Sequence, residues 1–249
     1  MTDMFTPGKL GNLELDNRIM RSAVWEAMAD EDGFVTDSLV ECSRALAEGG
    51  VGLIILGYSY IQPNGRQQPG QTAIYSDEHV AGMRKITDAV HEAGGRVSTQ
   101  IVHVGPQTNP DMIGGETPVA PSAVDHRIFG MPRDLTNEEV WKIIEDFGHA
   151  ARRSAEAGFD AIQIHGAHGY LVSQFISPLW NQRTDEFGGS LEGRMRFASE
   201  VYQAVRAIAG DLPLFIKLNV DDFVEGSTTP EDSLPLARKL DELGIDGIE

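Results

Sequence analysis

Two histidines and a tyrosine stand close together in the middle of the chain. His165 and His168 are three residues apart, and Tyr170 follows two residues later in the segment His-Gly-Ala-His-Gly-Tyr-Leu. Imidazole N–H groups can donate hydrogen bonds to a carbonyl oxygen, and a phenol can deliver a proton to carbon. Two other interpretations stay open on spacing alone. The histidines could satisfy loop backbone with Tyr170 as packing, or they could bind a metal, although no third ligand is obvious nearby.

The element that positions these residues is a buried strand. The apolar run 161–164, Ala-Ile-Gln-Ile, leads into the segment and predicts a strand that ends where a long loop begins. The other expected strands are 18–22, 52–56, 97–102, 214–218 and one starting at 245. The expected helices are 37–48, 77–93, 136–157, 190–209 and one starting at 229, with a long irregular stretch at 105–133.

Helix starts are marked by capping residues. Thr136 and Glu139 form a capping box, Ser190 is a typical N-cap, and Pro230 suits the first turn of the helix after Thr229. These signals support the alternation of strands and helices along the chain.

Strands that alternate with helices predict a parallel sheet covered by helices, an α/β fold. We find no internal repeat or linker and assign one domain, 1–249. The pattern gives five strand–helix units and the start of a sixth strand, whereas a closed (β/α)8 barrel has eight. We therefore expect a TIM barrel that is incomplete here and ends at about strand six. In such a barrel, chemistry takes place at the carboxyl ends of the strands.

Composition excludes several classes of partner. The 249 residues carry a formal net charge of −18, which disfavours nucleic acid and an anionic membrane surface. Cys42 is the only cysteine, so there is no internal disulfide and no Cys-rich metal site. No apolar run has the length of a membrane span, and the N-terminus lacks a signal-peptide pattern, so we expect a cytoplasmic protein. The oligomeric state stays open, and a homo-oligomer is compatible with the sequence.

Other functional motifs are absent from the sequence. It contains no dinucleotide-binding glycine fingerprint, P-loop, His-Glu-x-x-His or Gly-x-Ser-x-Gly motif. His91 and His149 are interpreted as ordinary helix residues, and we expect no metal site.

The segment 165–171, together with 174–190, resembles the signature of the Old Yellow Enzyme family, the flavin-dependent ene-reductases. The resemblance covers nearly the whole chain. Further blocks that fall in family order are 5–7, 13–19, 52–55, 63–66, 76–79, 100–105 and 120–122. The first two of these resemble the family's N-terminal hairpin leading into strand one.

The resemblance implies a TIM barrel that binds FMN and uses NADH or NADPH as reductant. The substrate would be a small electron-poor alkene, an α,β-unsaturated carbonyl compound. His165 and His168 would bind its carbonyl oxygen, and Tyr170 would protonate the α-carbon. Donors aimed at an oxygen that gains negative charge lower the barrier to hydride addition.

The resemblance also implies the FMN contacts. Gln100 would bind the pyrimidine edge of the flavin, and Lys217 would favour the anionic reduced form. The backbone contacts would come from Ser22, Ala23, Val24, Trp25 and Tyr58.

The chain departs from the family at several positions. Trp25 stands where many relatives carry Cys or Thr, Ala23 replaces a frequent proline, Lys217 a frequent arginine, and Pro106 another arginine. The family's phosphate cradle, from strands seven and eight, is missing, so we expect a C-terminally truncated chain.

Two alternatives stand beside the flavoenzyme. One is a barrel lyase that forms a Schiff base on Lys217, since a desolvated lysine on a strand can act as a nucleophile. The other is an inactive fragment of a flavoenzyme.

Overall fold

The sheet that carries the candidate residues is parallel and follows the chain order. The computed structural model describes residues 3–249, and its main sheet has the strand order β3-β4-β6-β9-β10-β11, with β5 pairing to β6. The strands are β3 (Met20–Arg21), β4 (Leu53–Ile55), β5 (Ser59–Tyr60), β6 (Val97–Val102), β9 (Ala161–Gly166), β10 (Leu214–Leu218) and β11 (Gly247–Ile248). Within the described residues, the six strands other than β5 are successive strands of the predicted barrel, which is open between β3 and β11.

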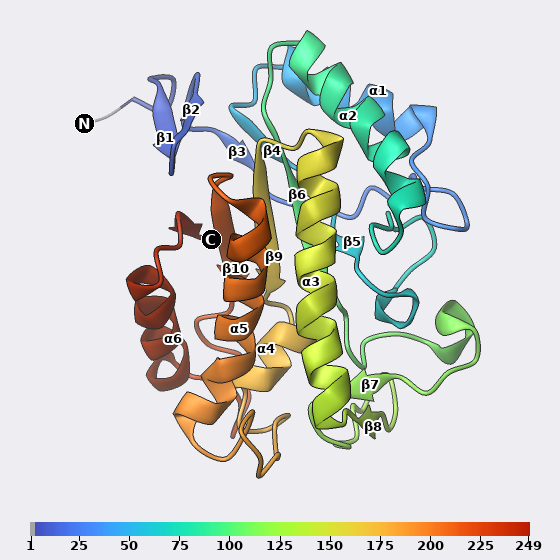
Figure 1. Ribbon diagram of the computed structural model, residues 1–249, viewed down its shortest axis with the longest axis vertical. Coiled ribbons are helices and arrows are strands. Elements are labelled where there is room, and N and C mark those ends of the chain that lie inside the picture. The colour runs from blue at the N-terminus through green and yellow to red at the C-terminus, as the bar shows by residue number, and fades with distance from the viewer. Residues whose placement is uncertain (1–2) are drawn as a thin grey trace.

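Helices cover one face of this sheet, as Figure 1 shows for α3 and α5. The helices are α1 (Asp37–Glu48), α2 (Val80–Glu92), α3 (Asn137–Ala157), α4 (Leu171–Ile176), α5 (Leu191–Ala209) and α6 (Pro230–Glu242). Short 3-10 turns are η1 (Pro63–Gly65), η2 (Asp77–His79) and η3 (Pro110–Ile113).

Successive side chains of each strand point to opposite faces of the sheet, so one face is apolar and the other carries the candidate site residues. In β9, Ile162 and Ile164 pack into the large core beneath the helices. The alternate residues Gln163 and His165 therefore face the barrel interior. The β9–β10 register pairs His165 with Lys217, and the β6–β9 register pairs Gln100 with Gln163. Backbone pairing thus brings the candidate side chains onto one surface.

The other end of the barrel interior is closed by the N-terminal hairpin. Strands β1 (Gly8–Leu10) and β2 (Leu13–Leu15) pair antiparallel, which confirms the expected hairpin. Its leucines pack on the inward-facing residues Leu53, Ile55, Ala161 and Phe215. The interior is therefore apolar at the hairpin end of the strands.

The predicted helix starts are confirmed. Thr136 and Glu139 form both bonds of the capping box of α3, and the Ser190 side chain accepts from the Gly193 backbone N–H at the start of α5. Thr229 precedes Pro230 at the start of α6.

Several boundaries differ from the expectation, and the first two barrel strands are shorter than predicted, at Met20–Arg21 and Leu53–Ile55. The helix expected at 77–93 starts as η2 and becomes α-helical only at Val80. Strand β9 continues through Gly166, so His165 is part of the strand. The expected long loop is wrong in part, because α4 begins directly after Tyr170. The 105–133 stretch is irregular apart from η3 and the short β7 (Val119–Ala120), which pairs with β8 (Arg133–Asp134).

None of the helices in residues 3–249 combines the length and the apolar character needed to cross a membrane.

Candidate active site

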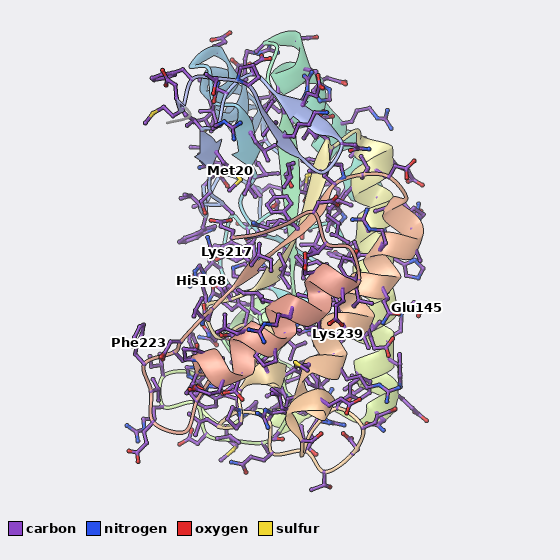
Figure 2. All side chains as sticks on the ribbon, turned by 90° about the vertical axis from the view of Figure 1, so that its left-hand side faces the viewer. Met20, Glu145, His168, Lys217, Phe223 and Lys239 are labelled. Carbon is purple, nitrogen blue, oxygen red and sulfur yellow. The ribbon has the colours of Figure 1, made fainter. Side chains whose placement is uncertain are left out.

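The candidate residues meet at the carboxyl ends of the strands. Figure 2 shows Lys217 and His168 on the same side of the molecule, away from Glu145 and Lys239. The site has two parts: a group of aromatic rings after β4 and β9, and a row of polar side chains across β6, β9, β10 and the ends of β3 and β11.

His165 is a buried neutral imidazole. It is 2% exposed, and burial, together with the nearby His168 and Lys217, holds its pKa well below the ordinary value. The backbone N–H of Ala167 donates to its Nδ1 at 3.3 Å. In a neutral imidazole one nitrogen accepts and the other carries the proton. This bond therefore places the proton on Nε2, which can donate to a ligand.

His168 lies in a strained turn beside His165. Its φ is 61° and that of Gly169 is 74°, and the left-handed region costs a non-glycine residue roughly 1 kcal/mol. Two long-range bonds hold the turn: the His168 N–H donates to Asn219 Oδ1 at 3.1 Å, and Gln107 Nε2 donates to the His168 carbonyl at 2.8 Å. The two imidazole rings lie 5.0 Å apart, edge to face. Both rings can therefore hydrogen-bond to the same polar atom of a ligand.

Tyr170 completes the aromatic group. Its ring lies 4.8 Å from His165 and 5.7 Å from Tyr58, and it packs with Val102 and Val104. Burial raises the pKa of Tyr170 and of Tyr58, so both are neutral phenols that can donate a proton.

The polar row is a continuous chain of hydrogen bonds. Gln100 Nε2 donates to Gln163 Oε1 at 2.6 Å, and Gln163 Nε2 donates to Glu249 Oε2 at 2.7 Å. Lys217 Nζ donates to Glu249 Oε1 at 2.6 Å and to Ser22 Oγ at 2.9 Å. The row thus satisfies polar groups that would be costly to bury alone.

Glu249 is the charged centre of this row. Burial works against its carboxylate, yet bonds from Lys217, Ser22 and Gln163 hold its pKa below the ordinary value. The Lys217–Glu249 pair is mostly buried, with side-chain exposures of 17% and 21%. The mouth of the barrel therefore holds a compensated ion pair rather than an isolated lysine.

The hydrogen-bonding groups left over in this row fit a flavin edge. An ammonium has three N–H bonds, and Lys217 uses two of them within the described residues. No hydrogen bond from residues 3–249 reaches Gln100 Oε1. A cationic donor and an amide oxygen match the mixed acceptors and N–H of the flavin pyrimidine edge. The residues present thus suit the predicted cofactor.

Four of the predicted backbone contacts, Ser22 to Trp25, lie where β3 ends, and Tyr58 follows β4. Ser22 joins the polar row, while Val24 and Trp25 are 54% and 40% exposed. A Cβ at Gly57 would collide with the Val24 carbonyl. Glycine at position 57 therefore lets the segments after β3 and β4 approach each other closely.

Sequence reasoning missed three polar residues of the site. Gln163 and Glu249 link Gln100 to Lys217, and Gln67 contacts the hydroxyls of Tyr58 and Tyr170. Gln163 carried a signal, since it stands two residues before His165 in an apolar strand and so shares its face. Gln67 carried none, because it lies in a loop between Gly65 and Gly70.

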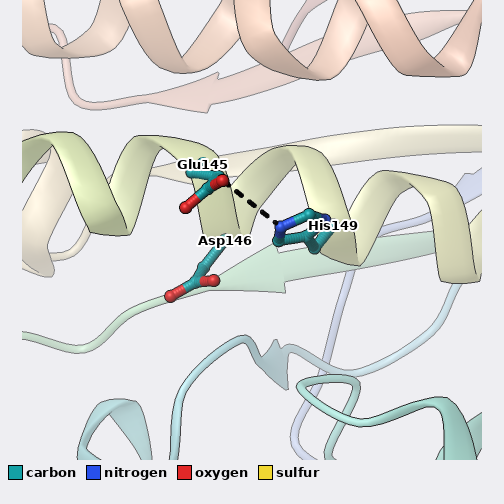
Figure 3. A group of neighbouring side chains, drawn as sticks. All are labelled: Glu145, Asp146 and His149. Atoms are coloured by element: carbon teal, nitrogen blue, oxygen red, sulfur yellow. Dashed lines mark ion pairs between the residues drawn. The ribbon is translucent and has the colours of Figure 1, made fainter.

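A separate group on α3 resembles a metal site but is already compensated. Glu145, Asp146 and His149 lie within ligating reach of one another, and Figure 3 shows the Glu145–His149 pair. However, Lys142 Nζ binds Glu145 Oε2 at 3.2 Å and Asp146 Oδ1 at 2.6 Å. We assign no metal to this surface, because the ammonium already occupies the acidic groups.

Comparisons with known proteins match nearly the whole chain. The model of the NADH:flavin oxidoreductase / NADH oxidase family matches residues 3–248. The chain is 41% identical over 246 residues to an NADH oxidase of Thermoanaerobacter brockii, which covers 98% of this chain and 38% of that protein. It is 38% identical over 250 residues to an NADPH dehydrogenase of Geobacillus sp. (strain WCH70), a match that covers 100% of this chain and 72% of that protein. The chain thus spans only part of the length of these relatives.

Solved structures give the same result. An Old Yellow Enzyme homologue from Zymomonas mobilis superposes with a TM-score of 0.92 at 32% identity, covering 99% of this chain and 72% of that one. Morphinone reductase superposes with a TM-score of 0.89 at 31% identity, and the match covers 98% of this chain and 70% of that one. These matches confirm the predicted fold class and the resemblance drawn from the sequence. They also support FMN with NADH or NADPH as the cofactors.

Proposed function

The chain belongs to the NADH:flavin oxidoreductase / NADH oxidase family, and from this premise we propose that it acts as an FMN-dependent oxidoreductase that uses NADH or NADPH to reduce the C=C bond of α,β-unsaturated carbonyl compounds. One observation carries the choice of substrate class. A neutral imidazole donor, His165, stands 4.8 Å ring to ring from a protonated phenol, Tyr170. Reduction of a conjugated alkene needs these two kinds of donor together.

The histidine pair would hold the substrate carbonyl oxygen. His165 offers its Nε2–H because Nδ1 is already an acceptor. No hydrogen bond within residues 3–249 occupies the His168 ring. Negative charge builds on the carbonyl oxygen when hydride adds at the β-carbon, and preorganised donors stabilise that charge without reorganising. A neutral histidine also keeps its donor over the whole physiological pH range.

Tyr170 would supply the proton to the α-carbon. Its raised pKa keeps the hydroxyl protonated at neutral pH, and the ring sits on the same side as both imidazoles. The C–H bond forms at the α-carbon as the Tyr170 O–H bond breaks, and solvent later returns the proton.

Gln100 and Lys217 would hold the cofactor. When bound, FMN would supply the hydride after its reduction by NADH or NADPH. The contribution of the chain is to place the Gln100 amide and the Lys217 side chain, paired with Glu249, at the pyrimidine edge.

The lyase alternative has less support. A Schiff base requires a free amine, whereas Lys217 Nζ lies 2.6 Å from the Glu249 carboxylate. An amine held in an ion pair is not free to attack a carbonyl carbon.

The test uses the FMN-loaded protein under anaerobic conditions. We expect NADH or NADPH to bleach the visible flavin absorbance, and a cyclic enone to restore it with formation of the saturated ketone. Reduced protein that is reoxidised by dioxygen but by no enone would contradict the substrate class. A covalent adduct on Lys217, trapped by borohydride with a carbonyl compound, would instead favour the lyase.

A further inference from the structure

Gln67 joins the two tyrosines of the site. Its side-chain Oε1 accepts hydrogen bonds from the hydroxyls of Tyr58 and Tyr170, each at 2.8 Å. The two rings lie side by side, with centroids 5.7 Å apart and an interplanar angle of 35°. One carbonyl oxygen therefore fixes the direction of both O–H bonds.

The loop that presents Gln67 is anchored rather than free. Gln71 is 1% exposed, and its Oε1 accepts from the backbone N–H of Gln67 at 2.8 Å and of Gln68 at 3.5 Å. The Arg66 guanidinium donates to the Gln68 carbonyl at 3.3 Å. A side chain on such a loop has a defined position relative to β4 and to the turn before α4.

We propose that Gln67 is a positioning residue for the proton transfer from Tyr170, an inference that rests on the proposed function. In the resting site its carbonyl holds the Tyr170 O–H. When that proton moves to the α-carbon, a C–H bond forms, the O–H bond breaks and the electron pair stays on the phenolate oxygen. Rotation of the Gln67 amide then presents its N–H₂, which donates to the phenolate until water returns the proton. Hydrogen bonds to a charged acceptor are stronger than neutral ones.

Both halves of the amide are needed for this role. The C=O group serves the neutral phenol, and the N–H₂ group serves its anion. The Tyr58 hydroxyl donates to the same Gln67 oxygen, so this one amide holds both tyrosines. Gln67 therefore bonds directly to the Tyr170 hydroxyl.

The first test removes the amide. We expect Gln67→Leu to slow reoxidation of the reduced, FMN-loaded protein by an enone about fivefold to tenfold, the factor for one hydrogen bond. Flavin reduction by NADH or NADPH should stay within about twofold of wild type, because no proton is delivered to carbon in that step. Gln68→Leu is the matched control, a neighbour on the same loop without a hydrogen bond from its side chain to residues 3–249, and should leave both steps unchanged.

The second test is a pH profile of Gln67→Glu. A protonated carboxyl offers the same C=O acceptor and a donor, as the amide does, whereas a carboxylate has no donor and opposes the phenolate. Reoxidation by the enone should therefore speed up as the pH falls and the introduced carboxyl takes up a proton. A residue that only packs the loop would give a profile parallel to that of wild type.

A third readout needs no flavin. In protein with ¹³Cζ-labelled tyrosine, Gln67→Leu should accelerate hydroxyl proton exchange at two tyrosine signals, assigned by Tyr58→Phe and Tyr170→Phe, and Gln68→Leu should not. Reoxidation in Gln67→Leu that matches wild type, or unchanged exchange at both signals, would overturn the role of Gln67. Wild-type protein that no enone reoxidises would instead contradict the proposed function and leave the exchange experiment to decide whether Gln67 holds the hydroxyls.

Discussion

Removing the Tyr170 hydroxyl should separate the two halves of the catalytic cycle. In Tyr170→Phe the ring stays, so the packing against Val102, Val104 and His165 is retained. Only the hydroxyl and its bond to Gln67 Oε1 are lost. The change therefore tests proton delivery without opening a cavity.

The structure sets the expected size of two effects of Tyr170→Phe, one on the unfolding free energy and one on the rate of alkene reduction. Gln67 Oε1 keeps the Tyr58 hydroxyl as donor at 2.8 Å, so no buried acceptor is left unsatisfied, and the unfolding free energy should fall by only about 1 kcal/mol. Loss of a general acid slows its step by ~10²–10⁴-fold, which is roughly 3–5 kcal/mol of barrier. The kinetic effect should thus exceed the effect on stability several times over.

Anaerobic stopped-flow absorbance measures the two steps separately. Reoxidation of the reduced flavin by an enone should slow by the factor above, while reduction by NADH or NADPH should change less than about twofold. Tyr75→Phe is the control, because the Tyr75 ring packs against Tyr60 and His79 and not against the rings of the site. Equal slowing of both steps, or an unfolding free energy lowered by several kcal/mol, would refute the assignment of Tyr170 as proton donor.

Three further results are expected. His165→Leu should weaken binding of a phenol to the oxidised flavoprotein roughly 10–100-fold, because a donor to a charged oxygen is lost. A titration followed by flavin absorbance measures this affinity. His165→Asn keeps an N–H donor and should lose less of the affinity for the phenol. Lys217→Met should weaken FMN binding roughly tenfold or more and leave Glu249 without its cation. Lys239→Met, in the last turn of α6, is the control and should not change the Kd from fluorescence titration. Burial lowers the pKa of His103 to about 4. The stability that its neutral form contributes is therefore fully present above the unfolded pKa near 6.5 and is lost as the pH falls toward 4, at a cost of roughly 3 kcal/mol of unfolding free energy. Denaturant titrations of His103→Gln should show a smaller loss of unfolding free energy between these two pH values.

The arrangement of strands and helices could be predicted because local signals agreed with the fold. Buried parallel strands are nearly continuous apolar runs, and the starts of α3 and α5 carry N-caps that satisfy free backbone N–H groups. The short helix α4 had no such signal. All six of its residues are buried, so no polar face marks a helical period, and a strand, helix or loop fits the sequence equally well.

Strand geometry accounts for only part of the predicted site. Gln100, His165 and Lys217 lie on strands and share one face, since inward-facing positions recur every two residues. The roles expected for these residues, and for His168 and Tyr170 beyond the strand, came from the family resemblance. Gln67 reaches the tyrosines from a loop whose course depends on the hydrogen bond from the Gln67 backbone N–H to the Gln71 side chain. Loop geometry of this kind is set by tertiary hydrogen bonds, which a single sequence does not display.

The inward-facing residues change character along each strand, and that change indicates which end of the barrel does chemistry. In β9 the inward positions run from Ala161 through Gln163 to His165, and in β10 from Phe215 to Lys217. The apolar end is sealed by the hairpin leucines. The polar end would be costly to bury unless a partner or a ligand satisfied it. Because the polar row leaves a Lys217 N–H and the Gln100 carbonyl without partners among the described residues, the same pattern that builds the sheet also points to where a cofactor binds.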